Sequence, residues 1–151
     1  MTLTHPDMGS ASITMVSSST VQEFASLSAT ADSRWYWRGL VPDDYASTPS
    51  IIVVCAANAT SGAHGINVEV NTAKDAEDQD PTLTASTGQS VTVPGTAYLQ
   101  DRITFTASIP TLEPGDIVFG SVFRDGDGSG LTDSLAVPTL IVAVLLGYTP
   151  A

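Results

Sequence analysis

The chain has 151 residues, the length of one domain, with 16 acidic residues against five basic ones and a formal net charge of −11 at pH 7. Nucleic-acid surfaces obtain their affinity mainly from Lys and Arg, so this balance argues against a nucleic-acid partner. The single cysteine, Cys55, excludes an internal disulfide, and the 42% hydrophobic content argues against a disordered chain.

The hydrophobic residues fall into short runs separated by Ser, Thr, Gly and Pro, which is typical of strands and turns. One or two short strands are expected between Ile13 and Phe24, and an aromatic strand follows at residues 34–41. Residues 51–57 are apolar on both faces, which predicts a buried strand, whereas residues 66–71 alternate as in a half-buried strand. Further strands are expected at residues 102–106, 116–124 and 137–148.

No segment keeps an apolar period of 3.6 residues, so the expected fold is all-β. We predict a single β-sandwich, jelly-roll-like, of about eight antiparallel strands spanning residues 12–151, preceded by an extended N-terminal arm at residues 1–11. Polar connections are expected at residues 58–65 and 75–81, and Pro114-Gly115 suits the centre of a type II turn.

The first ten residues have neither a positively charged nor an apolar region, so no signal peptide is expected. The longest apolar run, residues 140–146, is far shorter than the roughly 20 residues of a membrane-spanning helix. We therefore expect a soluble protein made in a cytoplasm, with no membrane partner. The same run is more apolar than one face of a sandwich requires. It is interpreted either as a central strand of the monomer or as a strand that also forms a threefold contact.

Catalytic motifs are absent from the sequence, which has no phosphate loop, no nucleophile elbow and no zinc-binding helix signature. His5 and His64 stand beside Gly or Pro without a second ligand at metal spacing, and we expect both to be surface loop residues. Cys55 lies inside an apolar run and is expected to be a small buried hydrophobe. The chain is therefore not expected to be an enzyme.

The loop at residues 125–133 is the sharpest local signal. It resembles the start of a calcium loop, with Gly130 at the sixth position and oxygen-bearing residues at positions 1, 3, 5 and 9: Asp125, Asp127, Ser129 and Asp133. The twelfth position is Ala136, where an EF-hand has a bidentate Glu, and the flanking segments are predicted strands. A Ca²⁺ site and an ion-free acidic turn are therefore both open, as is a metal-dependent hydrolase as a third functional class. No other cofactor is expected.

The aromatic strand also has two interpretations. Trp35, Tyr36 and Trp37 would form a sugar-binding platform if exposed, whereas tryptophans two residues apart on a strand more often share the core face. Arg34, Tyr36 and Arg38 lie on the opposite face, where the arginines would pair with carboxylates at a subunit contact. In the arm, His5 and Pro6 would lie along a neighbouring subunit, and these residues complete the predicted interface.

Three segments together resemble a known family: residues 37–45, 112–116 and 123–127, the last followed by Asp133-Ser134. Their order is similar to that in jelly-roll-like capsid decoration (cement) and head-fibre proteins of tailed bacteriophages, and the similarity extends from about Val21 to the end of the chain. The resemblance implies a structural virion protein without catalysis or cofactor. It would be assembled in the host cytoplasm and bind the major capsid protein on the outer capsid surface as a homotrimer. The alternative is a tail-fibre or carbohydrate- or receptor-binding β-sandwich module.

Overall fold

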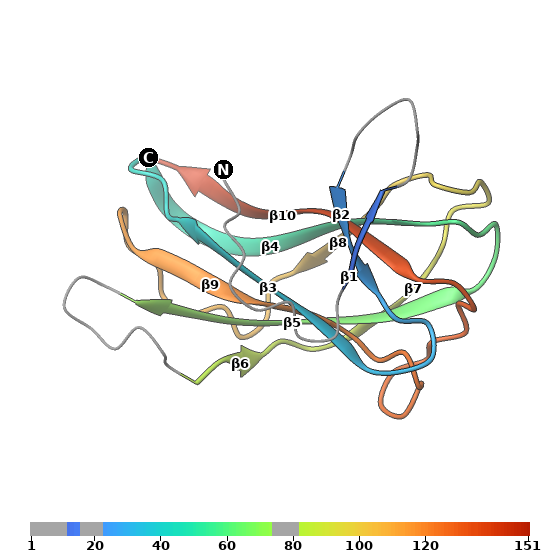
Figure 1. Cartoon of the computed structure of the whole chain (residues 1–151). Helices are drawn as coiled ribbons and strands as arrows, with labels where there is room; N and C mark the ends of the chain where they lie inside the picture. Colours follow the sequence, from blue (N-terminus) through green and yellow to red (C-terminus); the bar gives the residue numbers. More distant parts are fainter. Residues whose placement is uncertain (1–11, 16–22, 74–81) are drawn as a thin grey trace.

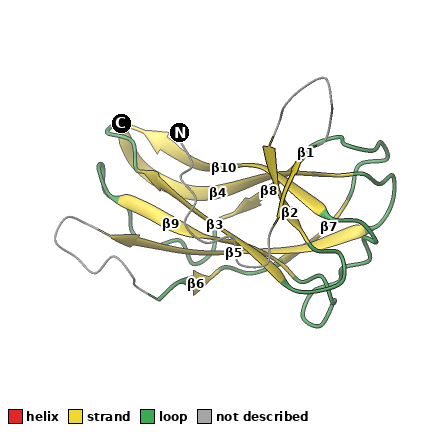
Figure 2. Cartoon of the chain, viewed as in Figure 1, coloured by secondary structure: helices red, strands yellow, loops and turns green. Residues whose placement is uncertain are grey.

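The computed structural model describes residues 12–15, 23–73 and 82–151, which form ten β-strands and no helix (Figures 1 and 2). The strands are β1 (Ser12–Met15), β2 (Glu23–Leu27), β3 (Ser33–Leu40), β4 (Tyr45–Ala57), β5 (Ala63–Ala73), β6 (Thr84–Ala85), β7 (Gln89–Thr92), β8 (Asp101–Phe105), β9 (Ile117–Arg124) and β10 (Thr139–Pro150). The predicted all-β class is confirmed. Within these residues, no helix is long and apolar enough to span a membrane. The predicted arm, with His5 and Pro6, and the whole 75–81 connection lie outside the described residues.

The strands form two antiparallel sheets packed face to face. Sheet A has the order β1-β2-β10-β4-β8, and sheet B has the order β3-β9-β5-β6, with β7 also paired to β5. In Figure 1, β4 and β10 belong to the upper layer, and β5 and β9 to the lower one. The chain is therefore a two-layer β-sandwich.

Strand pairing follows a nested pattern along the chain. The outer pair is β2 with β10, followed inward by β3 with β9, β4 with β8, and β5 with β6 and β7. Successive pairs alternate between the two sheets, as if one long hairpin had been wound around the core. This is the topology of a jelly roll, so the predicted architecture is confirmed.

The core lies between the sheets and contains every second residue of the long strands. Ile51, Val53 and Cys55 of β4 are fully buried and face Val68 and other apolar residues of β5 across the sandwich. The expected burial of Cys55 is confirmed.

Two connections test the predicted turns. Gly115 adopts a φ of +85°, and the Asp116 N–H donates to the Glu113 carbonyl at 3.1 Å, which confirms the turn at Pro114-Gly115. The predicted loop at residues 58–65 is too long, because β5 already begins at Ala63. Gly65 belongs to this strand, where a Cβ would lie 2.8 Å from the Leu131 side chain, so glycine here makes room for the loop that crosses it.

Candidate functional site

Strand β3 points its side chains alternately into the core and away from it. Trp37 faces inward and is 7% exposed, and Trp35 packs half-buried against the same core. Tyr36 faces outward and is 43% exposed, with Arg34 and Arg38 on its side of the strand. The core interpretation therefore holds for the tryptophans. No joint platform with Tyr36 forms, because adjacent residues of a strand face opposite sides.

The neighbouring strands continue this outward face in register. Each outward residue of β3 is paired with an outward residue of β9, which is paired in turn with one of β5. The resulting rows are Arg34–Phe123–Asn67, Tyr36–Ser121–Glu69 and Arg38–Phe119–Asn71. Together they form the sheet B outer face, which combines aromatic rings with side chains that donate and accept hydrogen bonds.

An ion pair holds the centre of the sheet B outer face in place. Arg34 Nη1 lies 2.6 Å from Glu69 Oε2, which also accepts a hydrogen bond from Ser121 Oγ at 2.9 Å. The Arg34 guanidinium lies 5.3 Å from the centre of the Phe123 ring, a cation–π contact. Arg34 thus has its carboxylate partner within the chain, and the contact fixes the orientation of both polar groups beside the ring.

The contribution of β9 to this face was not anticipated from the sequence. Phe119 and Phe123 are half-buried and point outward, but they belong to an almost uniformly apolar run in which alternation is hidden. One residue of the sequence, Gly120, does indicate which side of β9 faces the core. A Cβ there would meet the Glu69 backbone and lie 3.0 Å from Trp37, so the glycine marks the inward side, over which the indole packs.

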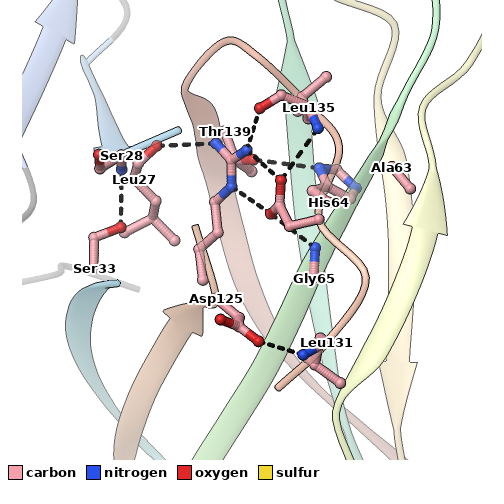
Figure 3. Close-up of polar contacts among 12 residues, drawn as sticks. Leu27, Ser28, Ser33, Ala63, His64, Gly65, Asp125, Leu131, Leu135 and Thr139 are labelled. Atoms are coloured by element: carbon pink, nitrogen blue, oxygen red, sulfur yellow. Dashed lines mark hydrogen bonds and ion pairs between the residues drawn. The ribbon is translucent and has the colours of Figure 1, made fainter. Parts of the chain in front are cut away.

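The Asp125–Asp133 segment is a loop between β9 and β10, as predicted. Its first carboxylate, Asp125, accepts hydrogen bonds from the loop's own backbone. Asp125 is 3% exposed and accepts the N–H groups of Ser129, Gly130 and Leu131. Figure 3 shows the contact with Leu131. Burial by itself would raise the pKa of Asp125, but these N–H groups outweigh it and hold the pKa below its usual value. Asp127 similarly accepts the Ser129 N–H, at 2.9 Å.

Asp133 is directed to a buried arginine. Arg124 is fully buried, and its Nε and Nη2 donate to the two Asp133 carboxylate oxygens at 2.8 Å each. The same guanidinium donates to the carbonyls of Leu135 at 2.7 Å and Val137 at 2.8 Å. The Gly65 N–H adds a 3.0 Å bond to Asp133. Burial would raise the pKa of Asp133, but Arg124 and the N–H groups hold it below its usual value.

The carboxylates that gather in the structure differ from the predicted calcium set. The oxygens of Asp125 and Asp127 come within 4.8 Å of those of Asp32, a residue before β3 that the loop pattern did not include, whereas Asp133 is not in this group. Burial, followed by repulsion from Asp127 and Asp125, raises the pKa of Asp32. The structure thus combines two of the predicted residues with a third from a distant segment, and calcium binding itself stays a prediction.

A second buried polar group corrects the prediction for His64. His64 is fully buried between the sheets rather than exposed in a loop, with Nδ1 3.3 Å from Thr139 Oγ1 (Figure 3). Its Nε2 lies 3.7 Å from Cys55 Sγ. Burial, reinforced by the positive charge of Arg124, lowers the pKa of His64 to about 4. Burial also raises the pKa of Cys55 to about 12. The imidazole is therefore neutral and the thiol protonated at pH 7, which fits a structural role.

Fold and site together define a jelly-roll sandwich with a partly aromatic, partly polar outer face on one sheet. No protein-family model matches the chain, and no curated protein matches it.

Solved structures with a related shape include a CBM4 module, which is 16% identical with a TM-score of 0.45 and covers 94% of this chain and 80% of that one. TmCBM61 in complex with β-1,4-galactotriose is 10% identical with a TM-score of 0.39, covering 92% and 82%. A family 16 carbohydrate-binding module is 15% identical with a TM-score of 0.41, covering 92% and 86%. Likeness at this level carries no argument about function.

Proposed function

We propose that this protein is a carbohydrate-binding module that holds its ligand on the sheet B outer face. The observation that carries the proposal is the position of Tyr36 beside Phe119 and Phe123, on a face whose other side chains are mainly hydrogen-bonding groups. One side of a sugar ring presents C–H groups that stack on an aromatic ring, and its edge presents hydroxyls that need donors and acceptors. The sheet B outer face offers both.

The polar side chains on this face are suited to orienting hydroxyls. The Arg34–Glu69 ion pair presents a cationic donor and an anionic acceptor side by side, and charge-assisted hydrogen bonds are stronger than neutral ones. The pair is only partly exposed, with 35% and 19% of the two side chains accessible, so its geometry is set before a ligand arrives.

The spacing of the aromatic rings indicates an oligosaccharide rather than a single sugar. Phe119 and Phe123 are four residues apart on β9, which corresponds to about 13 Å along a strand. Tyr36 lies one strand away, opposite Ser121, midway between them. A ligand that contacts all the rings must therefore extend along β9 beyond the length of one pyranose.

A glycan array followed by calorimetry on the best ligand tests the proposal. Tyr36→Ala is expected to weaken binding by about tenfold, the equivalent of one aromatic contact of about 1.4 kcal/mol. The matched control is Tyr98→Ala, which removes a tyrosine of similar exposure, 47% against 43%, from outside this face. Failure of the protein to bind any neutral or charged glycan, or equal losses in both variants, would contradict the proposal.

A structural role on a phage capsid is the second candidate and stays a prediction. The apolar outward residues of β10, of which Leu145 is 41% exposed, favour a protein that is covered in an assembly. A decoration protein binds only the assembled shell and stabilises it by mass action. Co-sedimentation with emptied phage heads tests this role, and a protein that stays in the supernatant at every concentration would speak against it.

A further inference from the structure

Three potential metal ligands converge between the two sheets. Cys55 of β4 and Asp101 of β8 are register partners in sheet A, so their side chains point to the same side of it. His64 of β5 reaches them from sheet B, with Nε2 3.7 Å from Cys55 Sγ and 3.9 Å from Asp101 Oδ2. One nitrogen of the imidazole therefore faces a thiol and a carboxylate at once. Together these residues form the Cys55–His64–Asp101 cluster.

The spacing within the cluster is close to that of zinc ligands. In a tetrahedral site, Zn–S is about 2.3 Å and Zn–N and Zn–O are about 2.0–2.1 Å, which puts the nitrogen about 3.5 Å from the sulfur and about 3.3 Å from the oxygen. The separation in this structure is about 0.2 Å longer for Cys55 and about 0.6 Å longer for Asp101. Cys55 and His64 are fully buried, whereas 20% of the Asp101 side chain is exposed, so this carboxylate is the ligand that must turn toward the others.

A fourth residue orients the imidazole. The other ring nitrogen, Nδ1, lies 3.3 Å from Oγ1 of Thr139, which is fully buried on β10 (Figure 3). Metal-binding histidines commonly give their second ring N–H to an oxygen, and this contact fixes the tautomer and the direction of the ring. With the proton on Nδ1, the lone pair of Nε2 is directed at Cys55 and Asp101 and is available to a cation.

The Asp101 carboxylate is partly buried without a compensating contact. Its distance from His64 is too long for a hydrogen bond, and among the described residues none donates a hydrogen bond to it. Burial therefore raises the pKa of Asp101 with no opposing contribution. A carboxylate in this position is costly, and a cation between it and the thiol removes that cost.

The charges of the cluster balance those of a divalent cation. A thiolate and a carboxylate contribute two negative charges, and the imidazole is neutral, so a bound Zn²⁺ leaves no net charge to bury. Arg124 and Asp133 also act on His64, but in opposite directions, and they form an ion pair with each other. The charged groups around His64 therefore do not exclude a cation.

We propose that the Cys55–His64–Asp101 cluster binds a zinc ion that joins sheet A to sheet B, with a water molecule as the fourth ligand. Thiolate, imidazole and carboxylate are the ligands that Zn²⁺ takes in proteins, whereas Ca²⁺ and Mg²⁺ take oxygen ligands. On binding, the S–H bond of Cys55 breaks, the Zn–S bond forms and the proton passes to the solvent. The ion lies inside the sandwich, on the opposite side of sheet B from its outer face, so this site is separate from the proposed glycan site.

Cobalt titration of the full chain tests the inference, because Co²⁺ occupies zinc sites and reports its ligands by colour. The expected result is binding of one equivalent, with a near-ultraviolet thiolate-to-cobalt charge-transfer band and the strong visible bands of tetrahedral cobalt, all abolished by added Zn²⁺. Zinc at 100 times its dissociation constant is expected to raise the Tm by about 5–10 °C.

Two variants assign the ligands. Cys55→Ser should remove the charge-transfer band. Asp101→Asn, at the partly exposed position, should keep the circular dichroism of the β-fold and weaken zinc binding by at least about tenfold, the least that loss of a supporting residue costs a metal site. Asp43→Asn replaces an exposed carboxylate outside the cluster and is the control, which should bind zinc as the unsubstituted chain does.

Three outcomes would overturn the inference. The first is the absence of any cobalt bands at millimolar Co²⁺. The second is cobalt bound without a thiolate band, as at Asp32, Asp125 and Asp127, whose carboxylate oxygens lie within 4.8 Å of one another. The third is an unchanged zinc affinity in Asp101→Asn. Glycan binding is measured separately and in chelator, so its absence refutes the proposed function and not the zinc site.

Discussion

Among single substitutions, replacement of Arg124 is expected to lower the free energy of unfolding most. It is fully buried and holds together segments that are far apart in the sequence: the end of β9, the 125–138 connection and, through a 3.4 Å contact with the Leu27 carbonyl, the end of β2. Replacing it by Met preserves much of the volume and removes every one of these hydrogen bonds.

The expected loss of stability follows from the buried polar groups that Arg124→Met leaves without their partner. The Asp133 carboxylate keeps the N–H groups of Gly65 and Leu135 but loses its counter-charge in a site where its side chain is 1% exposed. Removing one partner of a buried ion pair costs about 3–5 kcal/mol. The buried carbonyls of Leu135 and Val137 also lose a donor, at about 1–3 kcal/mol for each group left unsatisfied, so the upper part of that range is expected.

Urea unfolding followed by circular dichroism measures this loss. With a slope of about 2 kcal/mol/M, a loss of 4 kcal/mol lowers the midpoint by about 2 M, a large fraction of the total stability of such a domain. Arg102→Met, at an exposed arginine, is the control and should change stability by less than about 0.5 kcal/mol. A loss below about 1 kcal/mol for Arg124→Met would refute the argument that this ion pair fixes the loop.

Three further predictions concern other residues. The pKa of His64 is about 4 when folded and near 6.5 when unfolded, so the unfolded chain binds the proton first and stability falls by about 3 kcal/mol as pH drops from 6.5 to 4. In His64→Gln, the urea midpoint should fall less between pH 6.5 and pH 4 than it does in the unsubstituted protein. An equally steep fall in both proteins would contradict the burial of a neutral imidazole. Gly120→Ala should cost about 1–3 kcal/mol in thermal unfolding, because the added methyl meets the Glu69 backbone and the Trp37 ring; an unchanged Tm would mean that β5 and β9 are not held this closely. Asp32→Asn should raise the Tm in chelator by relieving repulsion among neighbouring carboxylates, and a decrease there would show that the charge is favourable.

The strand pattern of the sequence was sufficient for the class of fold. Residues 66–71 alternate strictly and lie in β5, and the apolar run at 51–57 is the buried end of β4. The turn at Pro114-Gly115 followed from local chemistry alone, because glycine is the residue that tolerates a positive φ there. These features depend on residues close together in the chain, where periodicity and turn propensity act directly.

Tertiary structure decided the features on which the functional argument depends. The run at 117–123 has no visible alternation, so only its pairing with β3 and β5 showed that Phe119 and Phe123 face outward. Asp133 was a plausible ion ligand by spacing, but Arg124 occupies its oxygens, and His64 is buried because Thr139 and Cys55 from the other sheet close over it. Each of these outcomes depends on residues brought together by strand register and sheet packing. The local sequence does not indicate which distant side chain will pack at a given position.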